Sequence, residues 1–502
     1  MSFYSDSNDD GRKKVITGIT KVADIVTSTL GPRGRTVAIN RPGMEPLTTK
    51  DGANVAANLS LQDHHENIGA LMLKGAMGKV AVLAGDATTQ TAQISSHLLT
   101  NVLDKNLVMR QFISELFEAR EAALAHVDDI KIPVTEDDFD LLKAVATTSC
   151  NNNPVLGQVM AEIISVIGQN GVVHIMEAPN KQNVSYEIKR GYTQRKGVVN
   201  RHFLRNKNQD NIPAPLVFVT EDKLVETAQV LPILEKYKKV YAIDPENIRP
   251  LVIVCPSCSD GASQTILKNK DEMPIWVTMC DDFESLLDIA GITGAHFFGE
   301  DKGFPTKQSG KQHKLPNYFG ECESVSVSAA GTTYYFEESK RLNDYIESVA
   351  TDGERLAKLT KGVGHIYVGG ATHAEIVDNC QLLEDAEGSC LGALKDGVLP
   401  GGAWAHLQLA DKLADLETDG ANALAAALAS VFTKLCQNSE VNPKEVPTDA
   451  DNTFNFITLK PESIETTKII DSVPAIKQAI INSVALSAQV LNIGHTVINH
   501  QL

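Results

Sequence analysis

The sequence predicts a multidomain fold of α and α/β parts, in which a helical domain built from both chain ends encloses an inserted α/β domain. Its 502 residues exceed what one hydrophobic core holds, so two or three domains are expected. Apolar residues recur at helical spacing near both ends, whereas short β-like runs alternate with helical segments in the middle. Because the middle differs from both ends, we expect an insertion that two connecting segments join to the rest.

Both ends of the chain carry helical patterns. The first roughly 130 residues are predicted to be helical, apart from a short β excursion at 36–39 and 47–49. Apolar side chains keep a three-to-four residue spacing over 68–83 and again over 94–103. Residues from about 405 to 502 are predicted to be helical again. An apolar stripe near the end consists of Ile476, Ala479, Ile480 and Val484.

The middle of the chain has the alternation of an α/β domain. Helical segments are predicted at 224–237 and 283–289. The β-like runs between and around them are 216–219, 251–254, 275–277, 295–298 and 333–336.

Composition narrows the class of protein. The formal net charge of −17 argues against a nucleic-acid partner, because nothing offsets repulsion from a phosphate backbone. Charges or glycines break the apolar stretches well short of about 20 residues, so no membrane-spanning segment is expected. The polar, acidic start at 1–10 is unlike a signal or transit peptide, and eight scattered cysteines suit a reducing cytoplasm.

One cysteine pair has the spacing of a redox motif. Cys255 and Cys258 follow the strand-like run 251–254. The chain has no second pair at metal-site spacing and no thioredoxin-like context around this one. We therefore interpret the pair as structural.

The segment Gly85-Asp86-Ala87-Thr88-Thr89 falls between two helical patterns and is predicted to open the second helix. Free amides and the positive dipole end attract an anion there, and an aspartate can hold the cation that accompanies a nucleotide phosphate. These residues indicate a phosphate site without a Walker A sequence. An ordinary helix start is the competing interpretation, as an ordinary turn is for Leu30-Gly31-Pro32-Arg33-Gly34-Arg35.

A third segment favours the phosphate-site interpretation over an ordinary helix start or turn. Glu384-Asp385 lies on a predicted helix and is followed by Gly397-Val398-Leu399-Pro400-Gly401-Gly402. Together with 30–35, which leads into Lys50-Asp51-Gly52, and with 85–89, this block resembles GroEL-type group I chaperonins. The resemblance runs nearly end to end, from Ile19-Thr20-Lys21-Val22-Ala23-Asp24 to the last helix.

The resemblance implies three domains. They are an equatorial ATP-binding domain (1–132 and 397–502), an intermediate domain (133–189 and 363–396) and an apical polypeptide-binding domain (190–362).

Hinges between these domains are implied at four positions. Pro133 and Gly397 lie at the lower boundary, and Gly191 and Gly362 lie at the upper one. Glycine absorbs large changes in φ and ψ, although any one of these glycines is also compatible with an ordinary turn.

The resemblance also implies an ATPase that uses Mg²⁺, with K⁺ as a further candidate cation. Asp51 and Asp385 are the implied catalytic carboxylates, since a carboxylate near the γ-phosphate can orient a water and accept its proton. Asp86 is the implied metal ligand. The implied ATP-binding residues are Thr29, Leu30, Gly31, Pro32, Lys50, Asp86, Ala87, Thr88, Thr89, Gln90, Gly402, Ile469 and Asp471.

Several positions depart from the family pattern. Ala87 stands where the phosphate loop of the family has glycine, and Gln90 replaces a threonine. Ala403 replaces the third residue of a glycine triplet, and Ile457-Thr458-Leu459 stands where an Asn-Ala-Ala base contact is expected. These changes predict an altered nucleotide affinity or rate, while all the carboxylates remain.

The polypeptide-binding face is less well kept. The resemblance implies client contacts at Val198, Phe203, Leu231, Leu234, Ile266 and Leu267. Ser263, Lys268 and His202 are polar where apolar or aromatic residues are usual, so we expect a narrower and more polar surface. The competing interpretation places Leu231 and Leu234 in the apical core.

The implied partners are unfolded polypeptides, identical subunits in a ring that is seven-fold by family, and a co-chaperonin lid as a candidate. The divergence fits a specialised or virus-encoded copy, for which the compartment would be the host cytoplasm. Two alternatives stay open. One is an ATPase-silent holdase, supported by Ala87 and Gln90. The other is a small-molecule phosphotransferase, which lacks an evident acceptor pocket.

Overall fold

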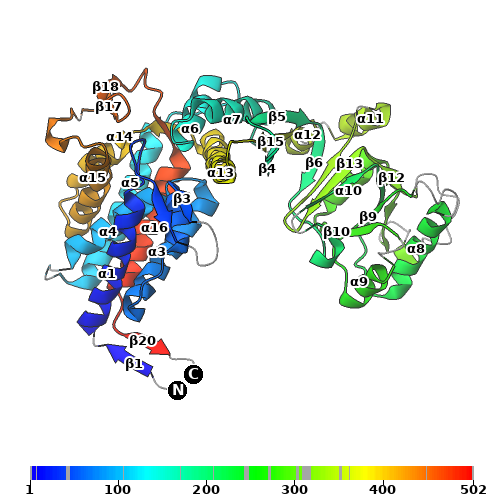
Figure 1. Cartoon of the computed structure of the whole chain (residues 1–502), viewed down its shortest axis with the longest axis horizontal. Helices are drawn as coiled ribbons and strands as arrows, with labels where there is room; N and C mark the ends of the chain where they lie inside the picture. Colours follow the sequence, from blue (N-terminus) through cyan, green and yellow to red (C-terminus); the bar gives the residue numbers. More distant parts are fainter. Residues whose placement is uncertain are drawn as a thin grey trace. The chain divides into compact units, whose positions relative to one another are not determined.

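The chain forms two compact units in a computed structural model, which describes residues 3–6, 8–40, 46–103, 105, 107–169, 171–206, 209–241, 248–269, 273–300, 305–307, 318–337, 339–349, 353–360, 362–447 and 449–499 (Figure 1). The helical unit comprises Met1–Gln169, Ile175–Tyr186 and Ile366–Leu502. The α/β unit comprises Asn170–His174 and Glu187–His365. The helical unit is therefore built from both ends of the chain, as the sequence predicts.

Long helices packed side by side form the helical unit. Helices α1, α3, α4 and α16 contact one another around a continuous apolar core that also includes α5, α14 and α15 (Figure 1). The predicted C-terminal stripe from Ile476 to Val484 is fully buried in this core. The helices are α1 (Asn8–Thr27), α2 (Gly52–Asn58), α3 (His64–Ala84), α4 (Thr88–Val102), α5 (Met109–Ile130), α6 (Phe139–Ser149), α7 (Pro154–Ile167), α13 (His373–Asp396), α14 (Trp404–Ala414), α15 (Asp419–Asn438) and α16 (Val473–Leu491).

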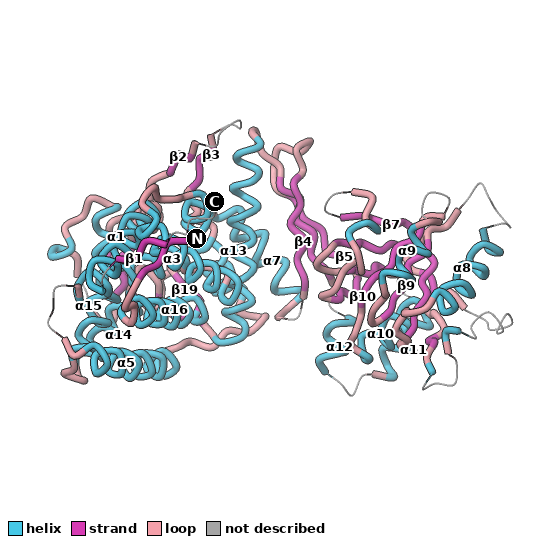
Figure 2. Tube along the Cα trace, turned by 90° about the horizontal axis from the view of Figure 1, so that it is seen from below, coloured by secondary structure: helices cyan, strands magenta, loops and turns pink. Residues whose placement is uncertain are grey.

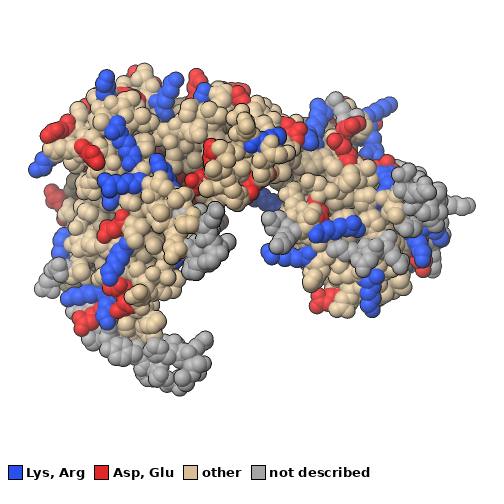
Figure 3. Space-filling view, viewed as in Figure 1, with Lys and Arg blue, Asp and Glu red and all other residues tan. Residues whose placement is uncertain are grey.

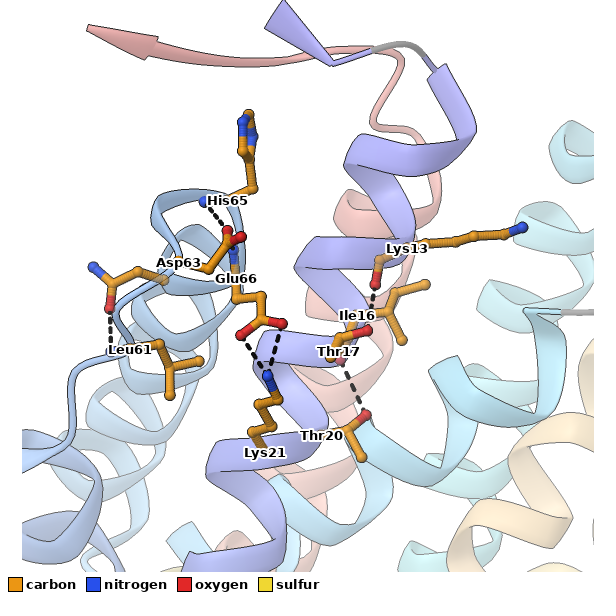
Figure 4. A network of polar contacts seen from close by, with 10 residues as sticks. Lys13, Ile16, Thr17, Thr20, Lys21, Leu61, Asp63, His65 and Glu66 are labelled. Carbon is orange, nitrogen blue, oxygen red and sulfur yellow. Dashed lines mark hydrogen bonds and ion pairs between the residues drawn. The ribbon is translucent and has the colours of Figure 1, made fainter. Parts of the chain in front are cut away.

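Helix α3 starts at a polar cap and is tied to α1 near that end. The Asp63 carboxylate accepts hydrogen bonds from the backbone amides of His65 and Glu66, the arrangement expected of an N-cap (Figure 4). Glu66 in turn forms an ion pair with Lys21 of α1, at 2.7 Å. These contacts hold the N-terminal end of α3 in place and thereby orient the helix toward the loop that follows its C-terminal end at Gly85.

Among the described residues, α3 is also the single helix long and apolar enough to cross a membrane, judged by length and composition. One of its faces is buried in the core of the helical unit, including Leu73, Met77 and Val80. Leu71 and Val82 lie on the opposite face and are exposed. Packing on one side is what a core helix of a folded domain shows.

Short two-stranded pairs lie between these helices and at the ends of the chain. The predicted excursion forms strands β2 (Val37–Ile39) and β3 (Leu47–Thr49), which pair antiparallel. The prediction of helix throughout 405–502 is wrong over 452–472 and again at 496–499. Turn-rich residues such as Asp451-Asn452 and Lys460-Pro461 interrupt the helical spacing there. The chain instead forms β17 (Asn452–Asn455) with β18 (Lys460–Ser463), β19 (Ile470–Ser472) with β16 (Val398–Pro400), and β20 (Thr496–Asn499) with β1 (Phe3–Asp6).

The α/β unit contains two sheets. Strands β10, β9, β8 and β11 are parallel in that order, and β12 pairs antiparallel with β8. A four-stranded antiparallel sheet has the order β6-β14-β13-β7. The strands are β6 (Gly191–Gln194), β7 (Gln209–Pro213), β8 (Leu216–Thr220), β9 (Leu251–Cys255), β10 (Ile275–Met279), β11 (Phe297–Phe298), β12 (Gly320–Glu321), β13 (Ser324–Ser328) and β14 (Thr332–Tyr335).

All five predicted β-like runs of the middle segment contain strands, the shortest being Phe297–Phe298. In Figure 2 the magenta strands of this unit lie among its helices. The predicted helix at 224–237 begins three residues later, because Leu224 forms a β-bridge with Cys258. The helices of this unit are α8 (Thr227–Tyr241), α9 (Asp260–Leu267), α10 (Phe283–Thr293), α11 (Lys340–Ser348) and α12 (Gly353–Thr360), with a 3₁₀ turn at Arg201–Phe203.

Three strands carry the chain between the units: β4 (Val172–Glu177), β15 (Val363–Val368) and β5 (Ser185–Lys189), paired in that order. The expected hinge glycines Gly191 and Gly362 lie at the start of β6 and just before β15. Gly397 has a φ of 97° beside Ile132 and Pro133. The division into three domains and the four hinges stay predictions.

Cys255 and Cys258 are both free thiols. Burial raises the pKa of the Cys255 thiol well above its usual range and also raises the pKa of Cys258. A thiol held protonated is a poor nucleophile, so these surroundings favour the structural interpretation.

Charged side chains of both signs are interspersed over the face of the helical unit in Figure 3. The excess of acidic residues in the chain therefore does not gather into one area of that face.

Candidate functional site

One cavity in the helical unit brings together every residue that the sequence predicts to contact a nucleotide. It also contains both predicted catalytic carboxylates, although the residues come from six separate parts of the chain. The lining is Thr29, Leu30, Gly31, Pro32, Lys50, Asp51, Gly52, Asp86, Ala87, Thr88, Thr89, Gln90, Thr148, Ser149, Asn151, Asn152, Leu382, Asp385, Gly402, Ala403, Val431, Leu435, Phe454, Asn455, Phe456, Ile457, Ile469 and Asp471.

The segment at 85–89 opens a helix, as predicted. Gly85 ends α3 with a φ of 75°, and Ala87 turns the chain with a φ of 73° into α4, whose first residue is Thr88. No side chain caps this helix start. Unpaired amides at the first turn of a 15-residue helix therefore face the cavity, together with two threonine hydroxyls.

A second wall of the cavity is the turn after α1. Gly31 has a φ of 81°, which glycine adopts without strain. The Asn438 amide donates to the carbonyls of Thr27 and Leu30, both at 2.9 Å, and holds the turn against α15. The Arg33 guanidinium donates to the carbonyls of Phe456 and Ile457, so the β17–β18 turn is tied to the same wall.

Four aspartates converge on the cavity from four separate parts of the chain. Asp51 caps α2, accepting from the amides of Ala53 and Asn54, and burial raises its pKa. Burial, reinforced by Asp86, Asp51 and Glu384, raises the pKa of Asp385 to about 9. Burial and Asp86 raise the pKa of Asp471 to about 7. So many carboxylates repel an anionic ligand unless a cation accompanies it.

Asp86 fits the role of a cation ligand. Its Oδ1 accepts from the amide of Ala87 and its Oδ2 accepts from the Ser149 hydroxyl at 2.9 Å, so one lone pair on each oxygen stays free. Among the described residues no group of three or more histidine, cysteine or acidic side chains has metal-site geometry. Mg²⁺ fits nonetheless, because it is commonly held by one or two carboxylates together with substrate phosphates.

Two departures from the family pattern keep a glycine-like backbone. Ala87 and Ala403 both stand where glycine is expected, and both adopt left-handed conformations, with φ of 73° and 63°. Each immediately precedes a helix that borders the cavity. The turns therefore persist despite a cost of roughly 1–2 kcal/mol for a non-glycine residue.

Sequence reasoning missed part of the lining. Ser149 ends α6, and Asn151 and Asn152 follow it with positive φ, of 50° and 62°. The run Asn151-Asn152-Asn153 was a usable signal, because asparagine is enriched in left-handed turns. Phe454 and Phe456 were missed since the β17–β18 hairpin was expected to be helical.

The predicted client contacts lie in the α/β unit, and their burial corrects most of them. Val198 and Leu234 are each 6% exposed, and Phe203 and Ile266 are fully buried, so these four pack in the core of that unit. The competing interpretation therefore holds for Leu234. Leu231 is 46% exposed on α8, and Leu267 is half-buried on α9, which packs beside α8. The rim assignment stays a prediction only for Leu231 and Leu267.

The model of the TCP-1/cpn60 chaperonin family matches residues 22–501, and the chain belongs to that family. It is 29% identical over 446 residues to chaperonin GroEL 1 of Rhodopirellula baltica, covering 82% of this chain and 74% of that protein. It is 27% identical over 526 residues to chaperonin GroEL 1 of Protochlamydia amoebophila, covering 96% and 91%.

Solved structures agree in fold. The chaperonin gp146 of bacteriophage EL, crystallised in the presence of ATP-BeFx, superimposes over 99% of both chains with a TM-score of 0.77 and 18% identity. A second crystal form of that protein gives a TM-score of 0.73 and 17% identity. The chain is thus a divergent GroEL-type chaperonin.

Proposed function

We propose that the chain is an ATP-hydrolysing chaperonin subunit that assembles into a ring and assists the folding of non-native polypeptides. The observation that carries this proposal is the single cavity lined by every predicted nucleotide residue. Helix α4 presents its free N-terminal amides there. Asp86 lies in the turn before α4, and Asp51 and Asp385 approach from the start of α2 and from α13.

In the proposed reaction, the first turn of α4 and Lys50 hold the phosphates. Asp86 would hold Mg²⁺, which would offset the negative charge of the phosphates. Asp51 and Asp385 orient the attacking water and accept its proton. At neutral pH the raised pKa keeps Asp385 protonated. Positive charge held at Asp86 would lower that pKa again and would let Asp385 accept a proton.

The ring, its seven-fold symmetry, client enclosure, a co-chaperonin lid and a cytoplasmic location belong to the same proposal. Membership of the chaperonin family supports them. One subunit has no chamber, so enclosure requires identical neighbours. Exposed Leu231 on α8 and half-buried Leu267 on α9, which packs against α8, offer the apolar contact that non-directional capture needs.

The proposal is tested by measuring phosphate release from purified protein with ATP and Mg²⁺, with and without a denatured client, while particles are imaged. We expect ring-shaped particles, turnover that stops when EDTA removes Mg²⁺, and a shape change on adding ATP. Rings that suppress aggregation but release no phosphate would overturn the proposed ATPase activity and favour the ATPase-silent holdase. Turnover by monomers that capture no client would overturn the chaperonin cycle.

A further inference from the structure

Three side chains form a hydrogen-bonded chain that ends on the proposed cation ligand. Ser149 Oγ lies 2.9 Å from Asp86 Oδ2 and 2.7 Å from Ser389 Oγ. Ser149 is the last residue of α6, and Ser389 lies on α13. Ser389 is 1% exposed and belongs to none of the motifs that predict the nucleotide site.

Ser149 is the central member of the three. Its hydroxyl is placed to donate to Asp86 Oδ2 and to Ser389 Oγ. A hydroxyl carries one proton, and a carboxylate accepts hydrogen bonds only, so the two acceptors hold the Ser149 side chain between them. Ser389 thereby fixes the orientation from which Ser149 reaches Asp86.

The position of Ser389 on α13 also connects these hydrogen bonds to Asp385. Ser389 follows Asp385 by four residues, so the two side chains lie on the same side of α13, one turn apart. A placement of α13 that puts Asp385 in the cavity thus also puts Ser389 against Ser149. The cation ligand and the proposed hydrolytic carboxylate are thereby connected through one helix.

We propose that Ser389 is a positioning residue for the cation site, which fixes the Asp86 carboxylate through Ser149 when α13 is docked. This inference rests on the proposed ATPase. Groups behind a metal ligand orient it, and their loss commonly weakens metal binding by about 10- to 100-fold. Ser389 acts one bond further away, so a smaller effect is expected.

The test uses the full-length protein and the variants Ser389→Ala, Ser149→Ala and the double variant. Calorimetry with a non-hydrolysable ATP analogue at stepped Mg²⁺ concentrations gives the apparent Mg²⁺ affinity, and phosphate release gives turnover. Ser389→Thr retains the hydroxyl and serves as the conservative variant. Ser430→Ala removes a buried hydroxyl whose recorded partners are the Ala427 carbonyl and the Gln93 amide, and is the matched control.

Ser149→Ala is expected to raise the Mg²⁺ requirement about tenfold. Ser389→Ala should raise it roughly three- to tenfold, with little change in kcat at saturating Mg²⁺. The double variant should match Ser149→Ala, because Ser389 acts on Asp86 only through Ser149. Ser389→Thr should lie near the parent, and Ser430→Ala should leave the Mg²⁺ requirement unchanged.

Additive effects of the two alanines, or a Ser389→Ala protein with the parent's Mg²⁺ requirement, would overturn the positioning role of Ser389. Neither result would contradict the proposed ATPase activity. An equal loss of thermal stability in Ser389→Ala and Ser430→Ala, without any change in Mg²⁺ dependence, would also overturn the proposal. It would show that Ser389 contributes only to packing. Failure of the proposed function looks different, because the parent protein itself would then bind no Mg²⁺-nucleotide.

Discussion

Gly85 and Gly388 meet face to face where α13 lies against the phosphate loop. A Cβ placed on Gly388 would lie 2.5 Å from the Cα of Gly85, and one placed on Gly85 would lie 2.6 Å from the Cα of Gly388. Real Cβ atoms do not approach backbone this closely, so both positions need glycine for the helix to dock. Gly388 immediately precedes Ser389 and follows Asp385 by three residues. The contact therefore determines how near both side chains come to the cavity.

Gly388→Ala is expected to move α13 away from the phosphate loop. Alanine favours a helix over glycine by about 1 kcal/mol, so the helix itself would be kept, but its new methyl group would meet the backbone of Gly85. Turnover should fall by about tenfold or more while nucleotide binding through α4 persists, because a misplacement of about 1 Å already costs a large factor in rate. Phosphate release and calorimetry check the two parts.

Gly75→Ala in α3 is the matched control. It makes the same exchange inside a helix, and nothing lies within 4 Å of the added atom. It should keep full turnover and gain slightly in stability. Parent-like turnover in Gly388→Ala would mean that the close contact with Gly85 does not position α13.

Asp385→Ala should leave ATP binding nearly intact and remove most turnover. In the proposed reaction this carboxylate acts on the attacking water, so its loss affects the transition state more than the bound ground state. A rate loss of about 10²- to 10⁴-fold is expected. Unchanged steady-state hydrolysis would exclude Asp385 from the site.

Asp86→Ala should instead weaken Mg²⁺-ATP binding itself, which calorimetry detects as a lower nucleotide affinity.

The pKa of Asp385 also predicts how the nucleotide-free protein responds to pH. Burial raises this pKa to about 9, whereas an unfolded aspartate titrates near 4. Between about pH 4 and pH 9 the folded state therefore binds more protons at this position, so its contribution to the free energy of unfolding falls as the pH rises. Asp385→Asn, which carries no charge, should raise the melting temperature more at pH 8 than at pH 5. An equal shift at both pH values would contradict the raised pKa.

The sequence predicted the parts of the site that depend on local chemistry. A helix start such as Gly85 to Thr89 depends on the residue types at adjacent positions, so the sequence alone was sufficient to predict it. Alternation of strands and helices likewise predicted the α/β unit, because burial on both faces of a parallel sheet leaves continuous apolar runs such as Leu251 to Val254.

The sequence did not predict contacts made between distant elements. Ser149 and Ser389 are 240 positions apart, and no periodicity connects them. The hairpin at Asn452–Ser463 was missed since its strands are short and carry few apolar residues. Leu234 and Leu231 lie three residues apart on α8, and only the packing of the α/β unit decides that one is buried and the other exposed.

Ala87→Gly should improve nucleotide binding with little effect on stability. The left-handed conformation costs an alanine roughly 1–2 kcal/mol, which is offset by the backbone entropy that glycine loses on folding and by the buried methyl group of Ala87. Removing the methyl lets a phosphate approach the backbone of the loop more closely. We expect a severalfold gain in affinity by calorimetry and a melting temperature within a few degrees of the parent. An unchanged affinity would show that the methyl lies clear of the phosphate.

Leu231 and Leu234 provide a paired test of client capture on one helix. Leu231 is 46% exposed and Leu234 is 6% exposed. Leu231→Ser should weaken suppression of client aggregation while changing stability by no more than about 0.5 kcal/mol, as for most surface substitutions. Leu234→Ser should instead destabilise the α/β unit by about 2–5 kcal/mol, through a cavity and a buried hydroxyl. Ring assembly and basal ATP turnover should survive in Leu231→Ser, because the proposed nucleotide site lies in the helical unit. Aggregation assays and thermal unfolding separate the two effects. Full capture by a stable Leu231→Ser ring would mean that clients bind elsewhere than at this exposed position of α8.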